Sequence, residues 1–277
     1  MINLPKQILE DIEVQLFLEE IYSYWGYDFR NYALSFLKRR IQSFIYAEKL
    51  LNISQLQKRI LSDKSCLERF LLNLTVNVTS MFRDPSFYVA FRNEVIPRLR
   101  TYPFIRIWHA GCSTGEEVYS MAILLTEAGL YQRCRIYATD LNEQVLQKAK
   151  SGIFPLNLMQ NYTRLYIQSG GKTSFSEYYT AAYGNAIFSN YLRENLIFAQ
   201  HNLVMDSSFN EFNVILCRNV LIYFNQTLQN HVHKLFYHSL GSFGILGLGK
   251  QESIRFTPYE QEYQELVKSE KLYRRVN

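Results

Sequence analysis

The stretch Trp108–Ser120, WHAGCSTGEEVYS, joins an apolar run to a helical pattern. The apolar run predicts a strand over Ile105–Ala110, and the pattern after the turn predicts a helix over Glu117–Ala128. Between them, Gly111 and Gly115 allow a tight turn and a close approach of the backbone to a ligand. A glycine turn between a strand and a helix is a common nucleotide site in α/β proteins. The stretch therefore predicts an α/β fold and a place for its ligand.

Strands and helices alternate along most of residues 104–277, which predicts a parallel, doubly wound sheet. The ligand of such a sheet lies at the carboxyl ends of the strands, where the strand order reverses. The elements predicted after the first strand and helix are a strand over Cys134–Thr139, a helix over Asn142–Ser151, a strand over Phe212–Cys217, a helix over Gln226–Leu240 and a strand over Gly244–Gly249.

Three other segments depart from that alternation. Residues 1–75 carry apolar residues at helical spacing only, which predicts a small all-helical domain. Residues 76–103 follow, and Asp84–Pro85 within them indicates the start of a linker helix. The segment at about 153–200 is rich in Tyr, Asn, Ser and Gly, with short extended pieces. We expect it to form an inserted lobe with a small antiparallel sheet, because its aromatic content is too high for disorder.

Composition indicates a globular protein and disfavours a nucleic-acid binder, a zinc protein and a membrane protein. Of the 277 residues, 48% are hydrophobic and 20% are charged, which is ordinary for a soluble globular chain. The net charge of +5 is spread along the chain, whereas a nucleic-acid binder usually carries a stronger, clustered excess. Four scattered cysteines favour a reducing compartment and no zinc site. Neither a membrane span nor a signal peptide is recognisable. We expect a cytoplasmic protein without a metal ion.

The acidity of the glycine turn decides between ligands. Glu116 and Glu117 follow its second glycine, and the stretch has no lysine or arginine. A pyrophosphate favours bare amides at a helix N-terminus, and each nearby carboxylate would repel it by roughly 1 kcal/mol. S-adenosylmethionine fits better because it carries a sulfonium, an ammonium and one carboxylate but no phosphate. The alternative is that the two glutamates only complement the helix dipole.

Polar residues at two other strand ends belong to the same predicted edge. Asp140 ends the second strand, where a carboxylate can accept both ribose hydroxyls of an adenosine. Its alternative role is to cap the next helix, for which Asn142 is the other candidate. Arg218 and Asn219 follow the later apolar strand and would emerge beside the adenine or the amino-acid part of the cofactor. For Arg218 the alternative is an ordinary surface salt bridge.

Several segments, taken in order, resemble the chemotaxis receptor methyltransferases of the CheR family, and the likeness covers nearly the whole chain. The resemblance implies a Rossmann-like S-adenosylmethionine-dependent methyltransferase domain with a small all-helical N-terminal domain and a small inserted β-subdomain. The segments are NVTSMFRD (77–84), GCSTGEEVYS (111–120), ATDLNEQVLQKAKSGIF (138–154), HNL (201–203), FNVILCRNVLIYF (212–224) and GSFGILGLGKQES (241–253).

The resemblance also implies a reaction: methyl transfer from S-adenosylmethionine to glutamate side chains of chemoreceptors. The products would be γ-glutamyl methyl esters and S-adenosylhomocysteine. The partners would be cytoplasmic helices of methyl-accepting chemoreceptors, so the protein would act at membrane-bound receptors without inserting in the membrane. Met81 replaces the usual aromatic residue, and Val118 the usual proline. The implied cofactor contacts are Asn77, Thr79 and Arg83 of the linker helix, with Ala110, Glu116, Asp140, Asn202, Leu203, Arg218, Asn219 and Tyr223.

Methyl transfer to a glutamate needs alignment rather than a base. The carboxylate is already ionised at pH 7, so the enzyme has to orient it and exclude water. Arg83 can hold a carboxylate by paired hydrogen bonds, and Tyr223 can donate one near the methyl group. These two are therefore the predicted catalytic residues. The alternatives are an ion pair of Arg83 with Asp84 or Glu94, and a core position for Tyr223.

One basic run and three rival functions complete the prediction. Lys38–Arg40 could steer glutamate-rich receptor helices to the site, although a solvated helix face is the ordinary role of such a run. A non-catalytic receptor-binding module would share the fold. A nucleic-acid methyltransferase would show a strongly basic face and an NPPY-like motif, where this chain has CRNVLIYF. A nicotinamide-dependent oxidoreductase would need the GxGxxG turn, which is absent.

Overall fold

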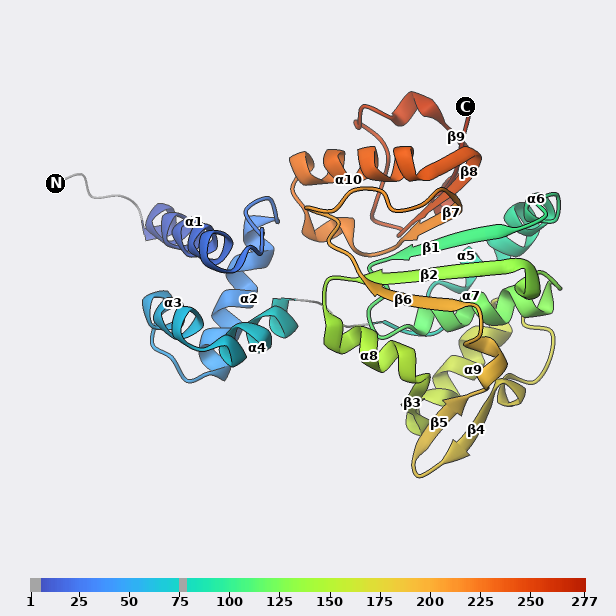
Figure 1. Ribbon diagram of the computed structural model, residues 1–277, viewed down its shortest axis with the longest axis horizontal. Coiled ribbons are helices and arrows are strands. Elements are labelled where there is room, and N and C mark those ends of the chain that lie inside the picture. Colours follow the sequence, from blue (N-terminus) through green and yellow to red (C-terminus); the bar gives the residue numbers. More distant parts are fainter. Residues whose placement is uncertain (1–5, 75–78) are drawn as a thin grey trace. The chain divides into compact units, whose positions relative to one another are not determined.

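The computed structural model describes residues 6–74 and 79–277 and divides the chain into two compact units (Figure 1). The helical unit comprises Met1–Val76 with Ile222–Gln229, and the sheet unit comprises Asn77–Leu221 with Asn230–Asn277. No helix in these described ranges is long and apolar enough to cross a membrane.

The helical unit is built around aromatic side chains. Phe70 packs edge-on against Phe17 at 5.5 Å and against Phe44 at 5.3 Å between ring centroids, and all three are buried. Such pairs add to the stabilisation that burial of the rings gives. The helices within residues 6–74 of this unit are α1 Lys6–Trp25, α2 Leu34–Ala47, α3 Ile53–Ser62 and α4 Lys64–Leu74.

The sheet unit contains seven strands in the order β6-β2-β1-β7-β8-β10-β9. The first five of that order run parallel, and β10 and β9 are antiparallel additions at one edge. The strand order reverses at β1, which lies between β2 and β7, so the doubly wound sheet is confirmed. The strands are β1 Ile105–Ala110, β2 Cys134–Asp140, β6 Leu196–Gln200, β7 Phe212–Cys217, β8 Leu240–Leu248, β9 Tyr263–Val267 and β10 Leu272–Arg275.

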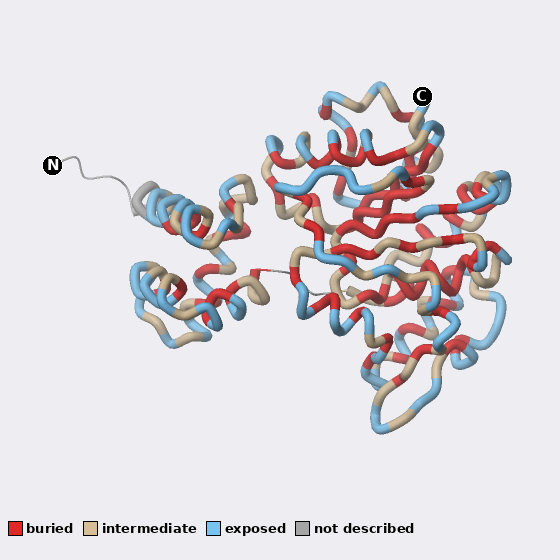
Figure 2. Tube along the Cα trace, in the orientation of Figure 1, coloured by how far each residue is buried: buried red, intermediate tan, exposed pale blue. Residues whose placement is uncertain are grey.

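Helices cover both faces of this sheet. In Figure 1, α7 Glu116–Glu127 and α8 Glu143–Ser151 lie on one face, and α10 Gln226–Ser239 lies on the other. Ile107 faces the α7 side, whereas the ring of its neighbour Trp108 lies 5.6 Å from Phe236 of α10. Because both faces are buried, the central strands are almost continuously apolar. Figure 2 shows this as buried backbone along β1 and β7.

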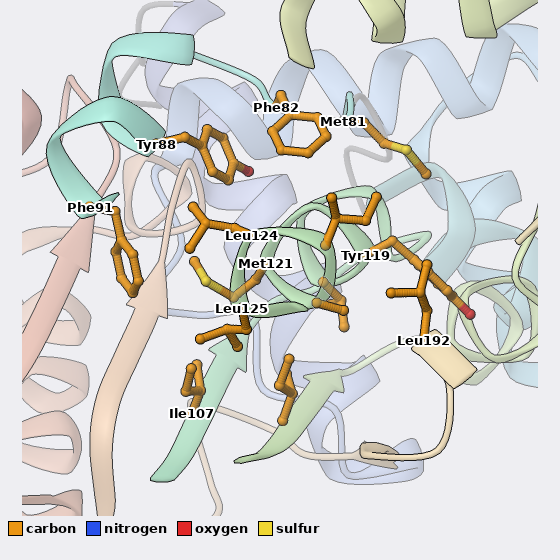
Figure 3. Close-up of a cluster of buried hydrophobic side chains, with 14 of the residues drawn as sticks. Met81, Phe82, Tyr88, Phe91, Ile107, Tyr119, Met121, Leu124, Leu125 and Leu192 are labelled. Carbon is orange, nitrogen blue, oxygen red and sulfur yellow. The ribbon is translucent and has the colours of Figure 1, made fainter. Parts of the chain in front are cut away.

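The segment before β1 closes the α7 side of the core. Met81, Phe82 and Tyr88 pack with Tyr119 and Met121 of α7 (Figure 3). The helix of this segment begins at Pro85, as Asp84–Pro85 indicates: it is α5 Pro85–Ala90, followed by the π-helical η1 Phe91–Val95 and by α6 Ile96–Leu99.

Thr79 and Arg83 therefore precede the linker helix, in which we had expected them. Phe82 and Asp84 have φ of 52° and 57°, in the left-handed region that a right-handed helix cannot contain. The backbone N–H of Phe82 donates to Ser120 Oγ at 2.9 Å. A tertiary contact thus accompanies the turn that delays the helix.

The inserted lobe carries a three-stranded antiparallel sheet in the order β3-β5-β4. It also contains a helix that was not predicted, α9 Met159–Gln168. Residues 196–200, which the prediction placed in the lobe, form β6 and pair in parallel with β2. The remaining elements are β3 Ile153–Pro155, β4 Tyr179–Ala182, β5 Asn185–Phe188 and the single 3-10 turns η2 Tyr131–Arg133, η3 Leu156–Leu158, η4 Phe175–Tyr178, η5 Asn190–Leu192, η6 Leu221–Tyr223, η7 Glu260–Glu262 and η8 Lys268–Glu270.

Candidate cofactor site

The turn between β1 and α7 packs tightly against neighbouring segments. Gly111 and Gly115 have φ of 79° and 94°. A Cβ on Gly111 would lie 2.5 Å from Val220 Cγ2, and one on Gly115 would lie 2.9 Å from Ala149 Cβ. Any larger residue would strain the backbone and also clash with the packed segment. Glycine is therefore required at both positions, and the turn presents its backbone at the switch point of the sheet.

Asp140 holds this turn from the next strand. The backbone N–H of Ser113, a residue with φ of 50°, donates to Asp140 Oδ2 at 2.9 Å, and that of Asn142 donates to Oδ1 at 3.0 Å. The cap of α8 is Asn142, whose side chain accepts from the Gln144 N–H at 2.9 Å. Burial raises the pKa of Asp140, and these hydrogen bonds oppose the rise. Each carboxylate oxygen keeps acceptor capacity for a ligand hydroxyl.

Glu116 lies in the first turn of α7 and is buried. Its Oε2 accepts from Thr114 Oγ at 2.7 Å. Burial raises the pKa of this carboxyl, and the Thr114 hydrogen bond only partly offsets the rise. A cationic ligand beside it would stabilise the ionised form, because an opposite charge at close range lowers a carboxyl pKa.

A chain of partly and fully buried ionisable side chains lies beside this turn. Arg218 Nη1 donates to Glu117 Oε2 at 2.7 Å, Nη2 donates to Asp84 Oδ2 at 2.8 Å, and His109 Nδ1 lies 3.1 Å from Glu117 Oε1. Burial raises the pKa of Glu117, but the charge of Arg218 and the hydrogen bond of His109 outweigh it and lower the pKa to about 2. Only 1% of the Arg218 side chain is exposed, so its ion pairs are not a surface salt bridge.

Arg218 also fixes the backbone that carries Arg83. Its Nη2 donates to the carbonyl oxygen of Arg83 at 3.2 Å, and its Cζ lies 4.0 Å from the ring centroid of Phe87. Asp84 pairs with Arg218, and Glu94 pairs with Arg98. The turn before α5 is thereby tied to the end of β7.

The loop after β7 is held by a residue that sequence reasoning missed. Glu252 accepts hydrogen bonds from the backbone N–H groups of Asn219, Val220, Leu221 and Gly249. Because all four donors are main-chain groups, no pattern of side chains signals the interaction. Asn219 itself has φ of 62°.

The remaining predicted residues fall in different places. Ala110 ends β1 and is buried, and Thr79 is half-buried in the turn before α5. Asn202 and Leu203 follow β6 beside Asp140, since the His201 N–H donates to the Asp140 carbonyl at 3.2 Å. Asn202 is itself engaged, because its N–H donates to Asp206 Oδ2 at 2.7 Å. The predicted contact Asn77 lies outside the described residues.

Tyr223, in η6, belongs to the helical unit. Its ring centroid lies 4.7 Å from that of Phe36 in α2, and its carbonyl oxygen accepts from the Ala33 N–H at 2.9 Å. The sheet unit thus brings together the glycine turn, Glu116, Asp140 and the Arg218–Asn219 loop at the carboxyl edge of its strands.

Residues 77–271 match the family model for the SAM binding domain of CheR methyltransferases, and residues 12–75 match the model for their all-alpha domain. This chain belongs to the CheR methyltransferase family. It is 49% identical over 265 residues to Cher3 of Pseudomonas putida, which is named as a methyltransferase, covering 96% of this chain and 97% of that one. It is 32% identical over 231 residues to a chemotaxis protein methyltransferase of Listeria monocytogenes, covering 83% and 85%.

Membership confirms the resemblance that the sequence motifs carried. The fold is that of an S-adenosylmethionine-dependent methyltransferase with an all-helical N-terminal domain, and S-adenosylmethionine is the cofactor. The nicotinamide alternative is thereby excluded. The roles of individual contact residues stay predictions, tested by the experiments below.

Proposed function

We propose that this protein transfers a methyl group from S-adenosylmethionine to glutamate side chains of chemoreceptors, forming γ-glutamyl methyl esters. One observation carries the chemistry of the site: a buried carboxylate, Glu116, and a half-buried one, Asp140, flank a turn that glycine is required to form. That arrangement suits a cationic cofactor and disfavours a phosphate. The receptor substrate is supported by relatives named as chemotaxis protein methyltransferases.

The residues at the sheet edge fit the cofactor. Gly111 and Gly115 set the shape of the turn that would hold it, because a Cβ at either position would clash with Val220 or Ala149. Asp140 would accept the ribose hydroxyls, and Glu116 would lie near the positive charge. When bound, S-adenosylmethionine supplies a methyl group on a sulfonium, which a carboxylate can accept without a general base.

The chain's own work is then to bind, orient and exclude water. Arg83 would orient the substrate carboxylate by two parallel hydrogen bonds. The backbone of Arg83 is held by Arg218, which is in turn fixed by Glu117 and Asp84. Tyr223 would donate a hydrogen bond beside the methyl group.

The experiment is a transfer assay with methyl-labelled S-adenosylmethionine and cytoplasmic fragments of chemoreceptors. We expect label on glutamate side chains, released as methanol by mild alkali as an ester should be, and no label with Asp140→Ala. Label that resists alkali would contradict an ester product. Binding of the cofactor without transfer to any receptor fragment would instead show a non-catalytic receptor-binding module.

A further inference from the structure

Glu252 is a buried carboxylate whose described hydrogen bonds all come from the backbone. It is 4% exposed. Its Oε1 accepts from the N–H groups of Val220 at 2.8 Å and Leu221 at 2.7 Å, and its Oε2 accepts from those of Asn219 at 2.9 Å and Gly249 at 2.5 Å. Four donors fill both oxygens, so the interaction requires the ionised form.

The approach of this carboxylate depends on a glycine. A Cβ on Gly249 would lie 2.6 Å from Glu252 Oε2 and 2.8 Å from the backbone nitrogen of Asn219. The Glu252 N–H also donates to the Gly249 carbonyl at 2.9 Å, so the two residues form one closed turn. The sequence GKQE (249–252) after β8 therefore places the Glu252 carboxylate where it accepts from the three consecutive N–H groups of residues 219–221.

Those three N–H groups lie in a conformation that needs external support. Asn219 has φ of 62°, in the left-handed region that few residues other than glycine and asparagine adopt. Successive backbone N–H groups that converge in this way form a small anion-binding nest. Such a conformation persists when surrounding contacts hold it, and here the Glu252 side chain accepts from all three N–H groups.

The loop that Glu252 holds packs directly on the cofactor turn. A Cβ on Gly111 would lie 2.5 Å from Val220 Cγ2 and 3.3 Å from its Cγ1. Val220 is thus the wall against which the first glycine of the turn closes. Its backbone N–H is one of the groups that Glu252 accepts from.

We infer that Glu252 is a positioning residue of the cofactor site: it fixes Asn219–Leu221 so that Val220 shapes the turn at Gly111. Glu252 acts through the loop and touches neither reactant. The inference rests on the cofactor site described above but not on the identity of the methyl acceptor.

The test measures the affinity for S-adenosylhomocysteine by calorimetry, alongside thermal unfolding. Glu252→Gln keeps the shape but turns an NH₂ group toward backbone donors, which should displace the loop. We expect the Kd to rise about tenfold, which corresponds to about 1.4 kcal/mol of lost binding free energy. A Kd within twofold of the wild-type value would overturn the inference.

Glu127→Gln is the matched control, because it separates positioning from stability. The Glu127 side chain is 3% exposed and accepts from Tyr178 Oη at 3.1 Å and the Lys172 N–H at 2.9 Å. It lies at the far end of α7, about 16 Å from the turn at 1.5 Å per residue. We expect a comparable loss of Tm but an unchanged Kd. An equal rise in Kd in both variants would reduce Glu252 to a structural role.

A second variant tests the route and remains usable if Glu252→Gln does not fold. Val220→Ala removes the contact with Gly111 and leaves the backbone donors to Glu252 in place. It should raise the Kd, and its effect should not add to that of Glu252→Gln if both act through one loop. An unchanged Kd in Val220→Ala would show that Glu252 does not act on the turn through Val220. Because the readout is cofactor affinity, failure to methylate receptors would leave this result intact and would count only against the proposed function.

Discussion

The pKa values of neighbouring carboxylates at the cofactor edge are shifted in opposite directions. Burial raises the pKa of Glu116 and of Asp140, whereas Arg218 and His109 hold that of Glu117 at about 2. A cationic ligand would stabilise the ionised forms of Glu116 and Asp140, whereas Glu117 already pairs with Arg218. Glu117 therefore holds Arg218 in place, and Glu116 is the better candidate for a contact with the cofactor.

The low pKa of Glu117 predicts a pH-dependent stability. Its folded pKa of about 2 lies below the ordinary 4.5, so the ionised form contributes stability above pH 4.5 that is lost as the pH falls towards 2. The full effect is roughly 3 kcal/mol at 1.36 kcal/mol per unit. Urea unfolding at pH 5 and pH 3 should show a smaller difference for Glu117→Gln than for the wild type. Equal differences would contradict the buried ion pair.

Tyr223→Phe distinguishes the two roles that the sequence left open for this tyrosine. Phenylalanine keeps the packing on Phe36, where the ring centroids are 4.7 Å apart. If the hydroxyl aids the transfer, kcat should fall at least tenfold while Tm stays constant. A kcat equal to that of the wild type would assign Tyr223 to the core alone.

At the level of elements, the central strands and helices could be predicted from the sequence. The helix predicted at Glu117–Ala128 is Glu116–Glu127, and the strand predicted at Phe212–Cys217 has those bounds. These elements are apolar runs ended by glycine or capping residues, so local pattern and tertiary burial agree. The strands β6, β9 and β10 were missed. β6 and β9 are edge strands without a buried run, and β10, which lies between β8 and β9, is only four residues long.

The positions of the candidate site residues were predictable where residue type and place at a strand end give the signal. The glycine turn and Asp140 are examples, since the chemistry of each residue and its position at a strand end suffice. The turn before α5 was not predictable, because the N–H of its left-handed Phe82 donates to the hydroxyl oxygen of Ser120, 38 residues away. Glu252 was missed for the same reason, since its partners are backbone groups brought together only by the fold.

Gly115 tests the packing of α7 against α8. It has φ of 94°, and an added Cβ would lie 2.9 Å from Ala149 Cβ and 3.2 Å from Ala149 Cα. Gly115→Ala should therefore lower the free energy of unfolding by more than strain alone and should weaken S-adenosylhomocysteine binding. Gly129→Ala is the control, because Gly129 has φ of 71° but nothing within 4 Å of an added Cβ. It should lose only about 1 kcal/mol, with binding unchanged. Equal losses in the two variants would mean that packing is not the constraint.

At the level of the whole molecule, charge bears on how an acidic receptor is captured. Of the basic run Lys38–Arg40, Lys38 pairs with Asp11 and Arg39 is exposed. Arg39 is therefore the residue to reverse first. Arg39→Glu should raise the KM for receptor severalfold at low salt, less at high salt, and leave cofactor affinity unchanged.

Arg255→Glu makes the same change of charge at an exposed position of the sheet unit and is the control for Arg39→Glu. It should leave the KM near the wild-type value if the helical unit does the steering. Equal KM values for the two variants would refute local steering and leave only an effect of net charge.

The most direct test of the account is a calorimetric titration of S-adenosylhomocysteine into the wild-type protein and into Asp140→Ala. The account predicts micromolar binding by the wild type, because the glycine turn and its carboxylates form the cofactor site. It predicts that Asp140→Ala loses that binding, since the variant removes both the ribose acceptor and the support of Ser113. No binding by the wild type, or equal binding by the variant, would contradict the assignment of the site to this edge of the sheet.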